Sequence, residues 1–482
     1  MIPMTLQQAA SKINASTESL SEAEKKLVFS NVVTDTRESM AGSLFIALKG
    51  DKFNAHDFLS TAKQQGAVAC LVDETKETTL PVLKVLNTQF AMAQLAQSIR
   101  QQLSIPFIGV TGSCGKTTVK EMIASILACK GRVLATKGNF NNAVGVPLTL
   151  FRLTEEHQFA VVEMGASKLG DIDEIAQLVM PDVALITSIS AAHLQGLGSL
   201  DGVAKVKGEL LDHLTEKGTA VLEHDSPWLH QWCEQLSTSQ GLMTFSIENK
   251  EANYHASSIS LDKQGRANFR ASTPLGNVEI DLPLAGRHNV SNALAAMAAA
   301  ITVGATLEAC QKGLSDIQPV KGRLQLLKGL AGSLIIDDSY NANPASLKVA
   351  LELLKTLPGK TMLVLGDMAE LGDQAEAAHR DAGKLAKVMD IDGFFATGKL
   401  SQVAVDSFGV GAKHFATREL LSEAIKTKIT TEQSSSVNLS VKDRENQPIW
   451  NLLIKGSRSA GMEKLVTDLQ IQQQKTGIQS CY

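Results

Sequence analysis

A glycine-rich segment that follows a short apolar run is the clearest chemical signal in this sequence. Gly109–Thr118 reads GVTGSCGKTT and leads into a run of helix-forming residues. Glycines let the backbone N–H groups of such a loop converge on phosphate oxygens, and the following helix adds the positive end of its dipole. Lys116 can then reach the β- and γ-phosphates, and the Thr117 hydroxyl can bind Mg²⁺. The segment therefore predicts a site for ATP with Mg²⁺.

The loop is a variant of the general phosphate-loop pattern G-x-x-x-x-G-K-[ST], because the first glycine of that pattern falls on Val110. Gly112 and Gly115 are instead the paired glycines of T-G-x-x-G-K-T-T. A chance Gly-Lys-Thr turn is the alternative, but a strand before the loop and a helix after it favour a phosphate site. The residues predicted to contact the nucleotide here are Thr111, Gly112, Ser113, Cys114, Gly115, Lys116, Thr117 and Thr118.

Two candidate metal ligands follow apolar strands further along the chain. Glu163 ends the run FAVVE, and His193 comes a few residues after the run Asp182–Ser188. Ligands of open α/β sheets bind at the carboxyl ends of strands, so both side chains could face the phosphate loop. Taken singly, Glu163 could be a salt-bridged strand end and His193 a solvated loop residue. Their joint position after a phosphate loop, where a second acidic metal ligand is expected, favours metal binding.

Two later segments combine polar residues with a strand end or a helix start. Leu284–Ala295 reads LAGRHNVSNALA, so Asn289 could cap the helix or contact a base equally well, whereas Asn292 inside the helix favours contact. The run Leu334–Asp338 ends in two aspartates and precedes SYNANP. An acid at a strand end before an Asn/Pro turn suits a ligand loop and also a plain turn, and the residues alone leave both open.

Composition excludes several classes of protein. The 482 residues are 44% apolar and 20% charged, which is typical of a soluble globular chain of about three domains. A net charge of −4 gives no reason to expect nucleic acid or an anionic membrane as partner. Six cysteines without C-x-x-C spacing fit reduced thiols, and neither a signal peptide nor a membrane helix is recognisable. We expect a cytoplasmic protein, and nothing demands more than a monomer.

Alternating strand and helix signals predict an α/β protein with domains at 1–103, 104–318 and 319–482. The first is a small α/β unit, and the second is a doubly wound unit that carries the phosphate loop. Its stretch Ser246–Pro283 is poor in helix formers and could form an antiparallel edge. The third is a second doubly wound unit with strands predicted at Leu334–Asp338, Thr361–Asp367, Gly393–Gly398 and Trp450–Gly456. Ser434–Gln447 is polar and predicts a loop, and the residues from Gln472 predict a polar tail.

The motifs together resemble the Mur ligases, from T-D-T-R near the N-terminus to K-G-S-R near the C-terminus. D-D-S-Y-N-A-N-P, L-G-D-M-x-E-L-G and K-G-S-R-S-x-x-M-E mark the members of that family that add D-alanyl-D-alanine. The resemblance implies a small N-terminal α/β substrate domain, a central P-loop ATPase-like doubly wound domain and a C-terminal Rossmann-like domain that closes over both. It implies an ATP-dependent amide ligase that adds D-alanyl-D-alanine to UDP-N-acetylmuramoyl-tripeptide through an acyl-phosphate, in peptidoglycan precursor synthesis.

The resemblance also assigns roles around the nucleotide. Lys116 and Thr117 would hold ATP and Mg²⁺, and the metal ligands would be Thr117, Glu163, His193 and Lys207. Lys207 falls on the lysine that the family carries as a carbamate; Lys205 is the alternative, and the spacing before G-E-L favours Lys207. Asn292 would contact adenine, Arg323 the phosphates and Asp338 the ribose. The residues expected to take part directly in catalysis are Lys116, His193, Lys207 and Arg323.

The same resemblance implies contacts to the other two substrates. The T-D-T-R block would belong to the UDP-substrate domain, and G-N-F-N-N-A-V-G-V-P would lie near the muramoyl peptide. The K-G-S-R block would face the incoming dipeptide. The residues concerned are Thr34, Asp35, Thr36, Arg37, Asn141, Asn142, Lys455, Ser457 and Arg458.

Two other interpretations come from different classes of protein. A GTPase switch would be expected to carry N-K-x-D for guanine, which the sequence lacks, and a transport ATPase is the related non-ligase alternative. A sister ligase is the second interpretation, either a folate polyglutamate ligase or the meso-diaminopimelate-adding enzyme. The D-N-P-R block of the latter is absent, and D-D-S-Y-N-A-N-P stands in the sequence instead. Phosphate release that requires both D-alanyl-D-alanine and the UDP-muramoyl tripeptide would discriminate these interpretations.

Overall fold

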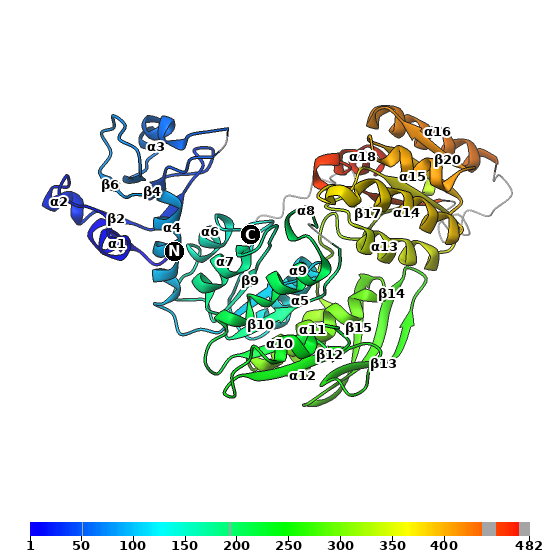
Figure 1. Ribbon diagram of the computed structural model, residues 1–482, viewed down its shortest axis with the longest axis horizontal. Coiled ribbons are helices and arrows are strands. Elements are labelled where there is room, and N and C mark those ends of the chain that lie inside the picture. The colour runs from blue at the N-terminus through cyan, green and yellow to red at the C-terminus, as the bar shows by residue number, and fades with distance from the viewer. Residues whose placement is uncertain (51, 192–193, 436–449, 472–482) are drawn as a thin grey trace, which may run out of the picture.

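The N-terminal part of the chain forms a small parallel sheet. The computed structural model describes residues 1–50, 52–191, 194–435 and 450–471 (Figure 1). The sheet has the strand order β3-β4-β5-β6; α1 and α4 pack on one face, and α3 (Leu59–Gln64) packs on the other. The bounds are β3 (Asn31–Val33), β4 (Ser43–Ile46), β5 (Ala69–Val72), β6 (Val82–Lys84), α1 (Leu6–Ile13) and α4 (Thr88–Arg100). The predicted α/β class is confirmed for this unit.

The central sheet has nine strands in the order β15-β14-β13-β12-β11-β10-β7-β9-β8. Its parallel part contains β7 (Phe107–Thr111), β8 (Val133–Ala135), β9 (Phe159–Glu163), β10 (Val183–Ile186), β11 (Thr219–Glu223) and β12 (Gly241–Ser246). The strands that complete it are β13 (Tyr254–Leu261), β14 (Arg266–Thr273) and β15 (Gly276–Ala285); β13 is parallel to β12, and the pairs β13–β14 and β14–β15 are antiparallel. The antiparallel edge predicted for Ser246–Pro283 is therefore confirmed.

Successive side chains of the central strands pack alternately into two separate hydrophobic cores, one on each face of the sheet. Phe107 and Val162 pack toward the layer that holds α6 (Gly145–Leu150), α7 (Asp171–Val179) and α9 (Leu200–Gly208). Ile108 and Val161 pack on the other face, against α5 (Lys116–Ala128), α11 (His288–Thr302) and α12 (Leu307–Ser315). Successive side chains of a strand point to opposite faces, so both faces of a parallel sheet need apolar residues and helix cover.

The C-terminal sheet has the order β16-β17-β21-β18-β19-β20, with only its edge strand β16 antiparallel. Its strands are β16 (Gln325–Lys328), β17 (Leu334–Asp338), β18 (Lys360–Leu365), β19 (Gly393–Thr397), β20 (Ala412–Phe415) and β21 (Trp450–Lys455). One core lies against α13 (Pro344–Thr356), α14 (Ala375–Val388) and α15 (Ser401–Phe408), and the other against α16 (Arg418–Ser435) and α18 (Glu463–Leu469). The predicted second doubly wound unit is confirmed.

Two predicted segments fall wholly or largely outside the described residues. The loop expected at Ser434–Gln447 begins inside α16 and otherwise lies in 436–449, and the tail from Gln472 lies in 472–482. Within the described part of the chain, no helix combines the length and the apolar character needed to cross a membrane. The predicted domain limits near 103 and 318 fall between the three sheets and stay predictions.

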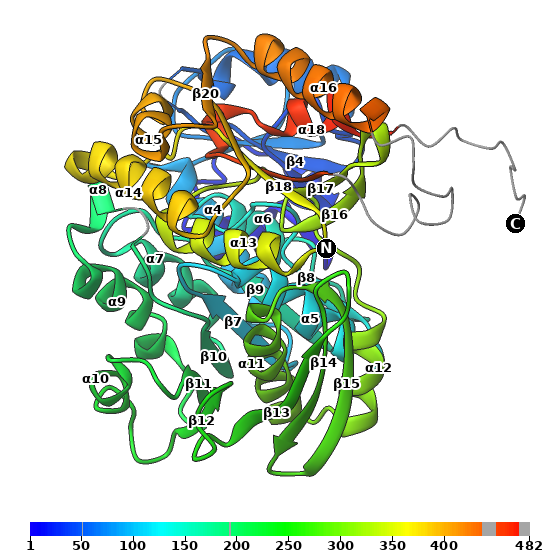
Figure 2. The same cartoon turned by 90° about the vertical axis from the view of Figure 1, so that its right-hand side faces the viewer.

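The N-terminal and C-terminal units lie at opposite ends of the molecule, both above the central unit (Figure 1), and the turned view agrees (Figure 2). Loops that follow central strands reach the C-terminal unit. The thiol of Cys114 lies 3.8 Å from Nδ2 of Asn343, and the backbone N–H of Gln195 donates to the carbonyl of Glu370 at 3.4 Å. The carboxyl edge of the central sheet therefore faces the C-terminal unit.

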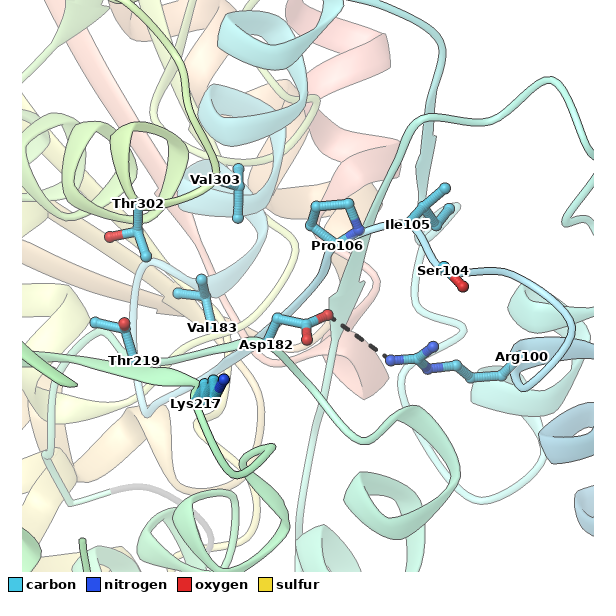
Figure 3. Close-up of a pocket in the computed structure, with 10 residues that line it drawn as sticks. All are labelled: Arg100, Ser104, Ile105, Pro106, Asp182, Val183, Lys217, Thr219, Thr302 and Val303. Atoms are coloured by element: carbon cyan, nitrogen blue, oxygen red, sulfur yellow. Dashed lines mark ion pairs between the residues drawn. The ribbon is translucent and has the colours of Figure 1, made fainter. Parts of the chain in front are cut away.

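A cavity of about 470 Å³ lies at the amino ends of β7, β10 and β11, away from this edge (Figure 3). Arg100, the last residue of α4, borders it and donates from Nε to the carbonyl of Val179 at 2.7 Å and from its two terminal nitrogens to Leu103 and Met180 at 3.2 and 3.0 Å. Asp182 lies 3.7 Å from the same guanidinium. These contacts of Arg100 connect α4 to the central sheet, so we interpret the groups around the cavity as structural.

Replacing Arg100 with alanine should weaken this connection. Removal of the guanidinium leaves three backbone carbonyls without a partner, and we expect the free energy of unfolding to fall by about 3 kcal/mol. Thermal and urea unfolding would measure the change. Lys217→Ala is the control, since Lys217 is an exposed residue of the same cavity; equal loss in both variants would contradict the role given to Arg100.

Candidate phosphate-binding site

The phosphate loop needs glycine at two positions because neighbouring side chains leave no room for a Cβ. Gly112 has φ +142°, and a Cβ there would lie 2.0 Å from Oγ1 of Thr187. Gly115 has φ +84° and immediately precedes α5; a Cβ there would lie 2.6 Å from Oδ1 of Asn292. Only glycine adopts these conformations freely. The loop is thus packed between the segment after β10 and the helix α11.

The segment after β10 holds the loop through hydrogen bonds. The backbone N–H of Ser113 donates to the carbonyl of Ser188 at 2.8 Å, and the Thr187 hydroxyl donates to the carbonyl of Cys114 at 2.5 Å. Thr111, the last residue of β7, is buried, and its hydroxyl donates to the carbonyl of Met164 at 2.8 Å. With its outer side fixed in this way, the loop presents the first N–H groups of α5, which have no partner within the helix.

Lys116 folds back over the loop, where its amine donates to the carbonyl of Gly112 at 2.6 Å. Its pKa is lowered, because burial outweighs the opposing effect of the Glu163 carboxylate, and the Arg323 guanidinium lowers it further. A neighbouring charge shifts a pKa strongly when it lies close to the titrating group. Lys116 therefore lies near Glu163 of the central sheet and near Arg323, which precedes the C-terminal sheet.

Glu163 ends β9 with its side chain only 2% exposed. Oε1 accepts a hydrogen bond from Nδ2 of Asn141 at 2.8 Å, and the backbone N–H donates to the hydroxyl of Thr136 at 2.9 Å. Oε2 is buried and has no partner among the described residues. A buried carboxylate oxygen without a donor is costly, so this atom suits a bound cation.

Lys207 lies on α9 and is 2% exposed, whereas Lys205 on the same helix is exposed. Within the described ranges no hydrogen bond or ion pair involves the Lys207 amine. Burial, with a smaller effect from the positive charge of Lys116, lowers the pKa of Lys207 to about 7. The structure therefore places Lys207, of these two lysines, beside Lys116 in the phosphate site.

His193 lies outside the described residues, so its predicted place beside Glu163 is not described. Among the residues that are described, no three His, Cys, Asp or Glu side chains cluster closely enough to bind a metal ion by themselves. The predicted metal site does not depend on such a cluster, because two of its four predicted ligands are Thr117 and Lys207. Of these four, the structure describes Thr117, Glu163 and Lys207.

The helix α11 brings two asparagines toward the loop, and they differ in role. Nδ2 of Asn289 donates to the carbonyl of Ala285 at 2.8 Å, and its Oδ1 accepts from Nδ2 of Asn292 at 2.9 Å. Asn289 is thus a structural residue in the first turn of the helix, but it does not cap it, because the N-cap residue is Arg287 and no side chain makes a capping bond. Oδ1 of Asn292 points to Gly115. Its predicted contact with adenine stays a prediction, on a side chain that does border the loop.

Arg323 and Tyr340 stack on each other beside the site. The guanidinium carbon of Arg323 lies 4.0 Å from the centre of the Tyr340 ring, and that of Arg458 lies 5.6 Å from the same centre. Nε of Arg323 is buried and has no partner among the described residues. This N–H donor is therefore free to bind a ligand, as the predicted contact of Arg323 with phosphates requires.

Asp338, Lys455 and Ser457 lie at or just after the carboxyl ends of β17 and β21. The Lys455 amine, 1% exposed, pairs with the Asp338 carboxylate and also donates to the carbonyl of Asn341 at 3.0 Å. The Ser457 hydroxyl donates to the carbonyl of Asp367 at 2.7 Å. Their predicted roles toward ribose and dipeptide stay predictions, and all three side chains already have protein partners.

His288 connects these residues to the central unit. Burial lowers the pKa of His288 to about 4 against the opposing effect of the Asp338 carboxylate, and the positive charge of Lys455 lowers it further. His288 begins α11 in the central unit, so the G-R-H-N and D-D-S-Y-N-A-N-P motifs meet across the boundary between the units. The sequence analysis identified both motifs but did not predict that they lie close together.

The residues predicted to bind the UDP-linked substrate lie in two places. Thr34–Arg37 follows β3, where Arg37 is 88% exposed at its side chain and binds Asp35 through Nε at 2.9 Å, which helps lower the pKa of Asp35 to about 2. Asn141 binds Glu163, while Oδ1 of Asn142 accepts from the backbone N–H of Gly145, the first residue of α6, at 2.8 Å. The structure therefore brings Asn141, but not the block after β3, into the phosphate site.

Sequence reasoning missed several residues at the same edges. Tyr340 and Thr136 escaped notice because an aromatic ring in a turn and a threonine before a loop carry no chemical signal alone. In the N-terminal unit, Lys49 and Glu74 follow β4 and β5 and bind each other at 2.7 Å. The position of a charged residue directly after a parallel strand was the available signal for this pair.

The family assignment comes from comparisons with known proteins. Residues 110–300 match the Mur ligase middle domain, and residues 322–437 match the Mur ligase, glutamate ligase domain. The UDP-N-acetylmuramoyl-tripeptide–D-alanyl-D-alanine ligase of Escherichia coli is 41% identical over 98% of this chain and 99% of its own. The protein of the same name from Bacillus subtilis is 36% identical over 92% and 94%.

Solved structures agree with these sequence matches. A crystal structure of MurF from Acinetobacter baumannii has a TM-score of 0.88 at 34% identity, over 97% of this chain and 98% of that one. A MurF ligase from Thermotoga maritima in complex with ADP has a TM-score of 0.78 at 25% identity, over 91% and 96%. Together with the geometry around Lys116, these matches establish that the chain belongs to the Mur ligase family.

Proposed function

We propose that this chain uses ATP to join the amine of D-alanyl-D-alanine to a carboxylate of UDP-N-acetylmuramoyl-tripeptide, a step of peptidoglycan precursor synthesis. The observation that carries the proposal is the convergence of Lys116, Glu163, Lys207 and Arg323 on one phosphate loop. The names of relatives that match nearly the whole chain supply the substrates.

The reaction needs cations at this point because a carboxylate must approach the γ-phosphate of ATP. The carboxylate oxygen forms a bond to the γ-phosphorus and ADP leaves; the dipeptide amine then attacks the acyl carbon, inorganic phosphate departs, and the nitrogen loses a proton. Two like unit charges about 4 Å apart repel by ~4 kcal/mol at an effective dielectric of about 20. Lys116 and Arg323 lower this cost by placing positive charge beside the transferred group.

The residues present fit Mg²⁺. The orphaned buried Oε2 of Glu163 and the hydroxyl of Thr117 are hard oxygen donors, and His193 and Lys207 complete the proposed ligand set. Mg²⁺, when bound, supplies charge neutralisation at the phosphate oxygens. Asn141 orients the carboxylate of Glu163 through its hydrogen bond to Oε1.

Lys207 can serve as an anionic ligand only if it is modified. A neutral amine reacts with CO₂ to form an N–C bond and release a proton, and the product carbamate is negatively charged. The burial of Lys207 favours that route, because its pKa of about 7 leaves much of the amine neutral near pH 7. The same burial makes an unmodified ammonium unfavourable beside Lys116.

The other two substrates approach from the outer units. We expect Arg37, which is exposed after β3, to bind the UDP-linked substrate, and we keep 1–103, 104–318 and 319–482 as the proposed limits of the three domains. In the K-G-S-R block, Arg458 is the residue best placed for D-alanyl-D-alanine, because it is exposed whereas Lys455 and Ser457 have protein partners. Since ATP and nucleotide-linked precursors are cytoplasmic compounds, we place the reaction in the cytoplasm, with the chain acting as a monomer in growth, cell shape and cell division.

Phosphate release from ATP tests the proposed function. Release should require UDP-N-acetylmuramoyl-tripeptide and D-alanyl-D-alanine together, because the acyl-phosphate turns over only when an amine is present. Replacing the dipeptide with glutamate or meso-diaminopimelate tests the sister-ligase interpretations. Release that is independent of either substrate would indicate a simple ATPase and contradict the proposal.

Lys207→Ala should abolish almost all turnover, because the site loses its proposed carbamate ligand. A short carboxylate such as acetate should restore part of the rate by occupying the vacated position. In the wild type, stimulation by bicarbonate should weaken as pH falls below about 7, since protonation removes the neutral amine. Lys205→Ala is the matched control on the exposed face of α9; full activity of Lys207→Ala would remove Lys207 from the site.

Glu163→Gln should lower kcat by roughly two orders of magnitude and raise the Mg²⁺ concentration needed for half-maximal rate, because the amide keeps the shape of the side chain but not its charge. Steady-state rates over a Mg²⁺ titration would measure both effects. Glu223→Gln, at the end of β11 in the same sheet, is the control. An unchanged Mg²⁺ requirement in Glu163→Gln would exclude Glu163 as a ligand.

A further inference from the structure

Tyr340 occupies a place that the backbone fixes from several sides. It follows β17 in the D-D-S-Y-N-A-N-P loop, and its N–H donates to the carbonyl of Gly322 at 3.2 Å. Lys455 pins the same loop at Asp338 and Asn341. Gly322 has φ +72°, and a Cβ there would approach the Cβ of Tyr340 to 3.2 Å. The position of the Tyr340 backbone, from which the ring projects, is therefore set by the fold before any ligand binds.

Two guanidiniums lie against this ring, at 4.0 Å for Arg323 and 5.6 Å for Arg458. An aromatic ring attracts a cation through its quadrupole and takes up none of the in-plane N–H donors, whereas a carboxylate would claim them and neutralise the charge. Among the described residues, no hydrogen bond or ion pair engages the side chain of Arg323, and its buried Nε is without an acceptor.

Another arginine–aromatic pair gives the contrast. Arg100 lies 3.9 Å over the ring of Phe107, but its nitrogens donate to three backbone carbonyls. The donors of the Arg100 guanidinium are thus already used in structural hydrogen bonds. Arg323 is held by its ring in nearly the same geometry with its donors unused, and its positive charge acts on Lys116 of the phosphate loop. The donors of Arg323 therefore remain available to an anion at that loop.

We infer that Tyr340 is a positioning residue for phosphoryl transfer: its ring holds Arg323, with Arg458 on the same ring, so that the guanidinium donors stay free for the transferred phosphoryl group. This inference rests on the proposed function. The tyrosine acts through Arg323 and has no bond to make or break. The ring, and not the phenolic hydroxyl, carries the effect, because no hydrogen bond of that hydroxyl is found among the described residues.

The test compares Tyr340→Leu with Tyr340→Phe in the phosphate-release assay. Leucine removes the quadrupole and should lower kcat about tenfold, with little change in KM for ATP, because Arg323 acts on the transition state. Phenylalanine keeps the ring and should retain most of the wild-type kcat. A rise in KM for ATP with unchanged kcat would mean that the ring contacts the nucleotide itself and would overturn the inference, as would equal losses in both variants.

A double-mutant cycle separates positioning from a structural role. If Tyr340 acts through Arg323, Tyr340→Leu should cost much less kcat in an Arg323→Ala background than in the wild type. Additive losses would overturn the inference. Phe107→Leu removes the ring from the Arg100 pair and is the matched control, expected to lower the unfolding temperature without changing kcat. Absence of activity in the wild type would instead count against the proposed function, so the two failures are distinguishable.

Discussion

The site depends on positive charges that are gathered in one place without enough negative partners. Lys116 and Arg323 act on each other, and Lys207 lies near Lys116 in a buried position. Among the described residues, Glu163 is the one Asp or Glu that raises the pKa of Lys116, and one of its two carboxylate oxygens already accepts a hydrogen bond from Asn141. Burying cations together is unfavourable in a protein interior, and the pKa values of both lysines are lowered accordingly. A polyphosphate supplies the negative charge that these groups lack among themselves.

The scaffold makes this arrangement possible because each charge belongs to a different rigid element. Lys116 begins α5, Glu163 ends β9, and Lys207 lies on α9. Each of these elements is anchored by apolar side chains in one of the two cores that cover the faces of the central sheet. Moving any of them would disturb that close packing. Apolar packing on both faces of the sheet thus holds the cationic groups close together. An anionic ligand that binds among them relieves their mutual repulsion, which favours binding.

The sequence predicted elements and strand ends well, since both depend on local pattern. The runs before Gly109 and Glu163 are short, apolar and bounded by turn residues, and each is a strand in the structure. The choice between Lys205 and Lys207 followed motif spacing, and burial now distinguishes them. The stacking of Arg323 on Tyr340 and the proximity of His288 to Asp338 escaped prediction because each brings together residues that are far apart in sequence. Period and propensity describe a single element and carry no information on which turns will meet.

The contacts that the sequence did not reveal are the ones that connect the ATP-binding loop to the C-terminal unit. The thiol of Cys114 lies against Asn343, and Asn343 caps α13 through its Oδ1 and the N–H of Ser346 at 2.8 Å. A contact of this weak kind, sulfur against amide at 3.8 Å, costs little to break, whereas the packing inside each unit costs much more. This contact alone therefore does not hold the C-terminal unit against the loop, and the packing of Ala285 of β15 in the C-terminal core also joins the two units. Since Arg323 and Tyr340 lie at the start of the C-terminal unit, the position of that unit determines where the guanidinium donors point at the phosphate site.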